Sequence, residues 1–288
     1  MRCSLLLLFV TLQFSLFAQD KPTEDTLRTL DIAPVTVSAS RFEAKNNRLP
    51  FAISILNKNQ IQRAQAQLSL NESLVALPGV FTLNPDNFSQ DLRISIRGFG
   101  ARAAFGIRGI RLFVDGLPES TPDGQADVDN VDAGALQRLE LLRGASAGLY
   151  GNASGGVLNL STEEPSQQSF VETQALAGSF GFQRFQVKSG FMSGKLGVFA
   201  SASQNQQDGF RAQSAMKQTT LNLKLRYQLS EDAKLSLLFN YGNSPYAQDP
   251  GGLTAEQVVS DRRQARTANV QFNGGEEVSQ GRVGLVFE

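Results

Sequence analysis

An unbroken two-residue alternation runs through residues 221–229, where Leu or Tyr takes every other position and Asn, Lys, Arg and Gln take the positions between. Because successive side chains of a strand point to opposite faces, this pattern predicts a strand with one apolar and one polar face. The same alternation recurs in residues 184–191, 196–202 and 235–241. Consecutive antiparallel strands of this kind form either a soluble sandwich or a membrane barrel whose apolar face meets lipid. Periodicity alone does not choose between these two architectures.

The N-terminus favours the membrane architecture, because it has the pattern of an exported protein. Residues 1–18 hold one Arg, an apolar core and a final Ala before a polar junction, which together predict a cleaved secretory signal peptide. The core is short and interrupted by polar residues, so it makes a poor membrane-spanning helix, although an uncleaved anchor is the alternative. Cleavage after Ala18 removes Cys3, the one cysteine of the chain, and the remaining chain suits an oxidising compartment.

The composition argues against an enzyme. The 288 residues include no His and one Cys, which excludes a Ser-His-Asp or Cys-His catalytic set, an imidazole metal site and a thiolate zinc cluster. Lys and Arg number 27 and Asp and Glu also number 27, a balance that is not typical of nucleic-acid-binding proteins. A hydrolase that uses two carboxylates is the remaining enzymatic alternative, and no paired geometry supports it. We therefore predict no catalytic residue, no resident cofactor and no nucleic-acid partner.

An acidic run is the one feature that suggests a metal. It comprises Asp115, Glu119, Asp123, Asp127, Asp129 and Asp132. The spacing of an EF-hand loop fails, since Val131 follows Asn130 and no Gly stands at the required place. The run therefore predicts a solvated loop and no metal site.

The pattern of predicted secondary structure changes near residue 166. Residues 19–40 are polar and predict a flexible leader. Residues 41–165 predict a small α+β domain, and residues 166–288 predict about six long strands joined by short turns and by longer loops. In the first domain we expect strands at 53–56, 92–97, 110–114, 136–142 and 155–160 and a two-part helix at 58–77; the longer loops of the second are expected at 204–216 and 243–275.

Six segments between residues 34 and 159 carry motifs in a fixed order. They are residues 34–41; residues 74–80, similar to L-x-x-x-P-G-V; residues 93–100, similar to I-R-G-F; residues 114–118, similar to V-D-G-x-P; residues 136–144, similar to I-E-R-I-E-V-L-R-G; and residues 149–159, similar to L-Y-G-x-x-A-x-G-G-V-I-N. Each motif alone is weak evidence, but together, in this order and spacing, they resemble the plug domain of TonB-dependent outer-membrane receptors.

The resemblance implies a fold. Residues 41–165 are expected to form an α+β plug domain inside an antiparallel transmembrane β-barrel of the plugged type, with about 22 strands. The strands of residues 166–288 are then the first strands of that barrel. About six strands cannot close around a plug, so we expect an incomplete barrel that either continues beyond Glu288 or comes from a broken gene product.

The resemblance also implies a function. Receptors of this family import a scarce ligand across the outer membrane of Gram-negative bacteria, with energy from TonB and its inner-membrane complex. The implied partners are therefore TonB, outer-membrane lipid and a small ligand, expected to be a ferric siderophore or a similar anionic complex. A quinone cofactor, cobalamin or another metal complex are alternatives within the class. A secreted β-rich binding or adhesion module without transport is the alternative from another class.

Three groups of residues take roles from the resemblance. Pro34, Val35, Thr36 and Val37 are expected to couple to TonB, because an extended segment can add to the edge of a partner's sheet. Arg97 and Arg143 are expected to latch the plug to glutamates of the barrel wall, with an ordinary surface Arg as the alternative. The ligand-binding group lies on loops of the plug and consists of Arg97, Phe99, Arg102, Phe105, Arg108, Asp123 and Gln125.

Arginines beside aromatic residues suit an anionic, partly planar ligand, and a solvated loop is the alternative for the same residues. Four further cations share the polar face of the predicted strands, namely Arg184, Lys188, Lys224 and Arg226. They predict either a basic lumen or hydrogen bonds to the plug and to water.

Overall fold

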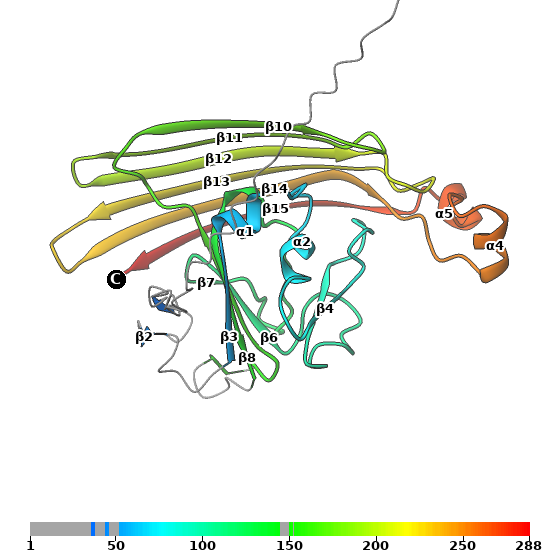
Figure 1. Cartoon of the computed structure of the whole chain (residues 1–288), viewed down its shortest axis with the longest axis horizontal. Coiled ribbons are helices and arrows are strands. Elements are labelled where there is room, and N and C mark those ends of the chain that lie inside the picture. The colour runs from blue at the N-terminus through cyan, green and yellow to red at the C-terminus, as the bar shows by residue number, and fades with distance from the viewer. Residues whose placement is uncertain (1–35, 38–43, 46–51, 145–149, 152) are drawn as a thin grey trace, which may run out of the picture. The chain divides into compact units, whose positions relative to one another are not determined.

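The computed structural model describes residues 36–37, 44–45, 52–144, 150–151 and 153–288 (Figure 1). The predicted signal peptide and most of the predicted leader lie outside the described residues, and so do Pro34 and Val35 of the predicted coupling segment. Within that segment, β1 (Thr36–Val37) pairs antiparallel with β2 (Ala44–Lys45).

A five-stranded sheet organises the plug region, in the spatial order β3, β8, β9, β6 and β7. β6 and β9 pair in parallel, and the other neighbours are antiparallel. The apolar residues of β6, at positions 110, 112 and 114, are buried in alternation with half-buried ones, as the pattern predicts. β3 is an edge strand of this sheet. The bounds are β3 (Ala52–Asn57), β8 (Leu136–Arg143), β9 (Gly156–Thr162), β6 (Ile110–Val114) and β7 (Leu117–Pro118).

Short helices follow β3. Asn57 caps α1 (Lys58–Gln62) by accepting from the Gln60 amide at 3.1 Å, and the Gln60 side chain accepts from the Asn57 amide at 3.0 Å. The two-part helix predicted at 58–77 is shorter than expected, because Ala64 and Gln67 adopt left-handed backbone conformations. α2 (Asn71–Leu74) then precedes the hairpin of β4 (Val80–Leu83) and β5 (Arg93–Ile96), and the 3₁₀ turn η2 (Ala133–Ala135) precedes β8. β4 was not predicted.

The plug region has an apolar core of its own. Leu112, Leu139 and Leu160 of the sheet are fully buried, together with Ile61 of α1 and Leu74 of α2. Burying a side chain of this size stabilises a fold by roughly 1.5–3 kcal/mol. The strands that follow β9 are therefore not needed to supply this core.

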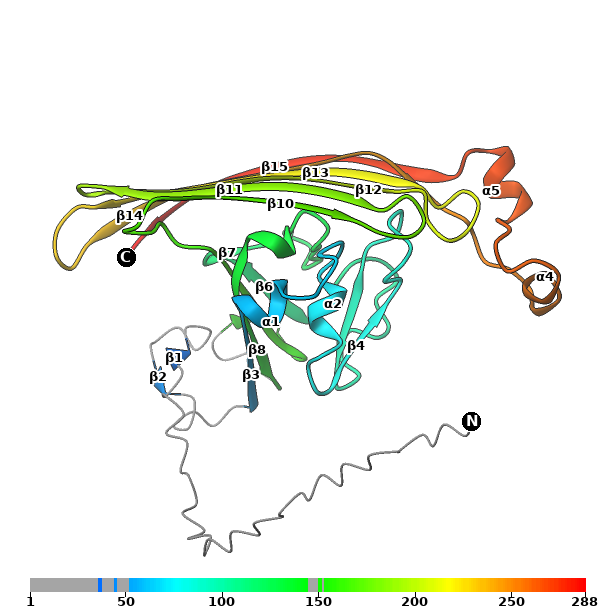
Figure 2. The same cartoon turned by 45° about the horizontal axis from the view of Figure 1, so that its top comes forward.

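The remaining strands form a second, six-stranded antiparallel sheet in which each strand pairs with its neighbours in sequence (Figures 1 and 2). Short turns at residues 178–182, 194–195 and 229–233 join β10 to β11, β11 to β12 and β13 to β14. The strand count agrees with the expected six. The bounds are β10 (Phe170–Ala177), β11 (Gln183–Ser193), β12 (Leu196–Gln207), β13 (Met216–Gln228), β14 (Lys234–Gln248) and β15 (Gly275–Phe287).

The polar face of this sheet is the buried one. On β11, Arg184 and Lys188 are buried, whereas Phe185, Val187 and Phe191 are exposed. A soluble sandwich buries the apolar faces of its sheets against each other, so this arrangement contradicts the sandwich alternative. It has the orientation expected for a membrane sheet, which turns its apolar side outward.

The loops of the second sheet differ from the prediction. β12 continues to Gln207 and β14 to Gln248, because these strand ends still pair with a neighbouring strand, Gln207 with Met216 of β13 and Gln248 with Gly275 of β15. The connection at residues 249–274 also contains two short helices that were not predicted, α4 (Ala255–Ser260) and α5 (Thr267–Gln271). No helix in the described part of the chain is both long enough and apolar enough to cross a membrane.

Candidate functional site

Oppositely charged side chains join the plug region to the polar face of the second sheet. We call the sheet residues the wall cations: Arg184, Lys188, Lys224, Arg226 and Arg282. We call their partners the plug acids: Asp115, Glu119 and Asp132, with Glu163 and Glu164 from the connection between β9 and β10. Each wall cation forms an ion pair with at least one plug acid. In these pairs the cation lies on the sheet, and the carboxylate lies on the plug or on the connection between β9 and β10.

The most deeply buried pair joins β11 to the turn before η2. Arg184 Nη2 donates to Asp132 Oδ1 at 2.7 Å, and the two side chains are 0% and 1% exposed. Asp132 also accepts from Gln186 Nε2 at 2.8 Å and from the Gly134 amide at 2.9 Å, while Arg184 donates to Asn205 Oδ1 at 2.7 Å. A buried charge is tolerated when it is paired and hydrogen-bonded. Here both carboxylate oxygens of Asp132 and both terminal nitrogens of Arg184 have partners, whereas Arg184 Nε has none among the described residues.

A second node surrounds Lys188. Its Nζ lies 2.8 Å from Glu163 Oε1 and also donates to Gln62 Oε1 and to the Gly134 carbonyl. Lys58 of α1 donates to the other oxygen of Glu163 at 2.8 Å. Burial opposes ionisation of Glu163, but the bonds from Lys188 and Lys58 lower the pKa of that carboxyl below its ordinary value. α1, which directly follows the edge strand β3, is thereby tied to the sheet.

The remaining pairs lie along β13 and β15. Lys224 Nζ donates to Asp115 Oδ1 at 2.8 Å and to Glu164 Oε1 at 3.2 Å. Asp115 also accepts from the amide and hydroxyl of Thr162 at 2.9 Å and 2.6 Å, which explains why a carboxylate stands at this point of the V-D-G-x-P-like motif. Arg226 pairs with Glu164, and Arg282 pairs with Glu119.

These contacts decide one prediction and correct another. The four strand cations predicted either to form a basic lumen or to bond to the plug do bond to it, as Arg184, Lys188 and Lys224 show. The solvated loop predicted for the acidic run is wrong at Asp115, Glu119 and Asp132, because these carboxylates bind the sheet. Local sequence did not distinguish the two cases, since the partners lie 52 positions away for Asp132 and 109 for Asp115.

The predicted latch residues bond elsewhere. Arg143 donates to the Pro78 carbonyl at 2.6 Å and to the Ala52 carbonyl at 3.4 Å, both in the plug region. Arg97 is exposed and has a left-handed backbone conformation. Among the described residues, neither arginine has an ion pair with a strand of the second sheet. Their expected glutamate partners stay a prediction.

The predicted ligand-binding residues fall into two groups. Arg108 Nη2 lies 2.8 Å from Asp123 Oδ2 and 3.0 Å from Gln125 Oε1, so two segments of the plug meet here. Mutual backbone bonds between Ile107 and Ala126, at 2.8 and 2.9 Å, hold the segments together. Bonds from the Thr121 hydroxyl, the Gln125 amide and Arg108 lower the pKa of Asp123 to about 2. The other four, Arg97, Phe99, Arg102 and Phe105, are exposed on the connection between β5 and β6.

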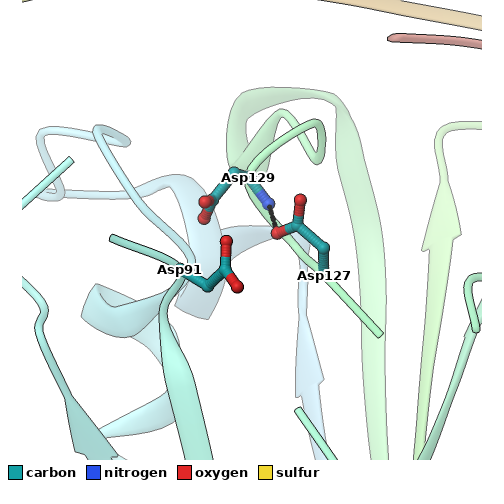
Figure 3. Close-up of side chains that lie close together, drawn as sticks. All are labelled: Asp91, Asp127 and Asp129. Carbon is teal, nitrogen blue, oxygen red and sulfur yellow. Dashed lines mark hydrogen bonds between the residues drawn. The ribbon is translucent and has the colours of Figure 1, made fainter. Parts of the chain in front are cut away.

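A cavity of about 120 Å³ lies between the plug and the second sheet, and the sequence did not indicate it. Asp91, Asp127 and Asp129 point toward one another in its wall (Figure 3), with one oxygen from each within 4.8 Å of the others. The Asp129 amide donates to Asp127 Oδ1 at 2.8 Å. Surrounding protein atoms and the neighbouring carboxylates raise the pKa of Asp127 and raise that of Asp129 well above its ordinary value. Burial and the proximity of like charges therefore both disfavour full ionisation of the cluster.

Comparison with known proteins shows which family the plug region is similar to. Residues 45–157 match the family described as TonB-dependent Receptor Plug Domain. The chain is 30% identical over 258 residues to the vitamin B12 transporter BtuB of Photobacterium profundum, a match that covers 85% of this chain and 40% of that protein. This chain thus spans about 40% of the length of that relative.

Two solved structures share the fold. FpvA of P. aeruginosa, bound to a heterologous ferric pyoverdine, superposes with a TM-score of 0.65 at 16% identity, over 88% of this chain and 33% of that one. The ferric citrate transporter FecA in its unliganded form superposes with a TM-score of 0.62 at 23% identity, over 74% of this chain and 34% of that one. At these identities the likeness shows the arrangement of plug and antiparallel sheet.

Proposed function

Because residues 45–157 are a TonB-dependent receptor plug domain followed by a receptor-type antiparallel sheet, we propose that this chain takes part in TonB-dependent uptake of a small anionic complex across the outer membrane of a Gram-negative bacterium. The observation that carries the proposal is the two-faced sheet. Its polar side is bound to the plug through the wall cations, and its other side exposes Phe185, Phe239 and Leu285. Such a sheet suits lipid on one side and a plugged lumen on the other.

The secreted binding module, the alternative function, fits this sheet less well. A protein released into water does not normally expose a contiguous row of large apolar side chains. Here β11, β14 and β15 each present such residues on one face, including Val187, Leu237 and Val283. Outer-membrane lipid is therefore the partner that we propose for this face.

Transport needs work, and the N-terminal side of the plug is where the fold can receive it. The predicted coupling segment precedes β3, which is an edge strand of the plug sheet. Removing an edge strand breaks one ladder, here the pairing of β3 with β8. α1 follows β3 without an intervening loop, and Lys58 at its start binds Glu163. A pull by TonB on the leader would therefore have to detach β3 alone before it acts on the ion pair between Lys58 and Glu163.

The loops of the plug support an anionic ligand. Arg97, Arg102 and Arg108 are exposed, and so are Phe99 and Phe105. Guanidinium groups bind carboxylates and phosphates well, and aromatic rings add contact area for a partly planar ligand. A ferric siderophore fits this chemistry; a quinone cofactor, cobalamin or another metal complex are the alternatives within the class.

Uptake by cells tests the proposal. Cells that produce the full-length protein are supplied with radiolabelled ferric citrate or vitamin B12, with and without a protonophore. Energy-dependent accumulation of one solute, lost after deletion of residues 29–40, is the expected result. Uptake that persists after this deletion contradicts TonB coupling. Recovery of the protein in the soluble extracellular fraction, and not in the outer membrane, would instead favour the secreted module.

A further inference from the structure

We infer that the wall cations form a concealed anion-binding track on the inner wall of the second sheet, which the plug acids occupy at rest and which an anionic solute occupies when the plug shifts. The inference rests on the proposed function, since it requires the plug to move. It adds a second binding site for the solute, separate from the exposed loops of the plug.

The first observation is a polar row that crosses the sheet. Lys188, Ser201, Asn222, Asn240 and Arg282 are successive cross-strand partners from β11 to β15. Asn222 Nδ2 donates to Ser201 Oγ at 3.1 Å, and Asn240 Nδ2 donates to Asn222 Oδ1 at 2.8 Å. Side-chain hydrogen bonds thus join the middle of the row, from Ser201 to Asn240, and a cation stands at each end of the row.

The second observation is where the neutralising charge comes from. Arg184, Lys224 and Arg282 each pair with a carboxylate from plug residues 115–132, namely Asp132, Asp115 and Glu119. Among the described residues, the one acid of the sheet strands that pairs with a wall cation is Glu172, which lies 3.2 Å from Lys188 and is half exposed. Movement of residues 115–132 away from the wall would therefore leave Arg184 and Arg282 without their carboxylate partners and would leave Lys224 with Glu164 alone.

Buried cations without counter-ions attract anions. Arg184 and Lys224 are 0% and 2% exposed, so uncovering them exposes charge beside low-dielectric protein, where electrostatic attraction is stronger than in bulk water. Arg184 and Arg282 offer planar forks that match carboxylates and phosphates, whereas Lys188 and Lys224 act as point charges. The solute class is then an anion with several oxygen groups, such as a ferric carboxylate or catecholate complex.

A cysteine beside Lys188 provides the reporter. Ser201 pairs across the ladder with Lys188 and is 5% exposed, so Ser201→Cys places a thiol that the plug covers at rest. The one cysteine of the 288 residues, Cys3, belongs to the predicted signal peptide, and any cysteine elsewhere in the full-length protein is replaced by serine. Cells producing the full-length variant receive ferric citrate or vitamin B12. They are then treated with a negatively charged sulfonatoethyl or a positively charged trimethylammonioethyl thiosulfonate, with and without a protonophore. The rate of labelling by the negative reagent is divided by the rate for the positive reagent, and this ratio is normalised to the same ratio measured on the denatured protein.

We expect labelling in energised cells, protection in de-energised cells, and a ratio that favours the negative reagent by about threefold or more. Adding Lys188→Gln should bring the ratio close to 1. The matched control Lys234→Gln, which removes a cation of β14 that pairs with Glu288, should leave the ratio unchanged. A ratio at or below 1, or an equal ratio in both variants, overturns the track.

Uptake measured in the same cells separates this inference from the proposed function. Energy-dependent uptake without labelling at residue 201, or with labelling that lacks charge preference, overturns the track and leaves transport standing. Absence of energy-dependent uptake together with absence of labelling overturns both.

Discussion

Arg184 Nη2 and Asp132 Oδ1 lie 2.7 Å apart with both side chains almost completely buried, one on a strand of the second sheet and the other on the plug. Neither charge has water available to replace its partner. Arg184 is also bonded to Asn205, and Asp132 to Gln186, so the pair is held in place from both sides. This contact makes the docking of the plug sensitive to single substitutions.

Asp132→Asn should destabilise the docked plug by about 3 kcal/mol, because it leaves a buried guanidinium without its counter-ion. Thermal unfolding of the purified protein measures the loss. The double variant Asp132→Leu with Arg184→Met should recover most of it, since no unpaired charge remains. The matched change Asp123→Asn removes the acid of an exposed pair with Arg108 and should have a far smaller effect. Equal losses in the two single variants would contradict the importance of burial.

The pH dependence of docking should follow Glu163. Its pKa is lowered in the folded protein, so it stabilises the fold at pH values above its ordinary value of 4.5, and this contribution is lost as the pH falls through the lower folded pKa. Glu163→Gln should therefore lower the melting temperature at pH 7, by roughly 4 °C for each kcal/mol lost. The difference between variant and wild type should shrink as the pH falls below 4.5 and through the lower pKa of the folded protein. A difference in melting temperature that stays the same at every pH measured would show that ionisation of Glu163 does not cause it.

The acidic cluster should behave in the opposite way. The raised pKa of Asp129 means that the folded protein holds this proton more tightly than the unfolded chain, so the stabilising contribution is present in acid and is lost as the pH rises. Asp129→Asn should thus raise the melting temperature at pH 7. The gain is expected to be about 1 kcal/mol or less, because solvent reaches Asp129 in the cavity. The variant and the wild type should converge below the ordinary pKa of 3.8; a variant that is less stable at neutral pH would refute the assigned repulsion.

Two glycines with left-handed backbones test the predicted ligand-binding loop. At Gly106, an added Cβ would lie 2.7 Å from the Gln125 side chain, whereas at Gly98 it would meet no atom within 4 Å. Both Gly106→Ala and Gly98→Ala should cost roughly 1–2 kcal/mol from backbone strain. Gly106→Ala should additionally displace Gln125 from Arg108 and reduce uptake of the transported solute. Equal uptake by the two alanine variants would show that the position of Gln125 does not matter for ligand binding.

Strands were predictable from sequence because their signal is local. The alternation at residues 221–229 depends on neighbouring residues alone, and β13 contains most of this segment. Thr254 and Gln257 form a capping box that marks the start of α4, but six residues are too few for an apolar periodicity to appear. Short helices in a long connection were therefore missed.

Arg108, Asp123 and Gln125, which lie within 17 positions of one another, were predicted as one ligand-binding group, and they do contact one another. Their role in ligand binding stays a prediction. Asp91 was not identified, because it lies 36 positions before Asp127 and no motif marks it. Likewise, a carboxylate such as Asp132 has the same local pattern whether water or a distant arginine is its partner. Burial is a property of the assembled fold, and a single sequence does not state it.

The separation of charge between plug and sheet also constrains how such proteins diverge. Lys224 and Asp115 stand 109 positions apart, yet they bind each other, so a change of sign at one of them should be tolerated best when the other changes with it. Among relatives, the two positions of such a pair should therefore change together and not independently of each other. A plug transplanted from another receptor would meet this set of cations with carboxylates in different places, so chimaeras should assemble well when the paired positions are exchanged together.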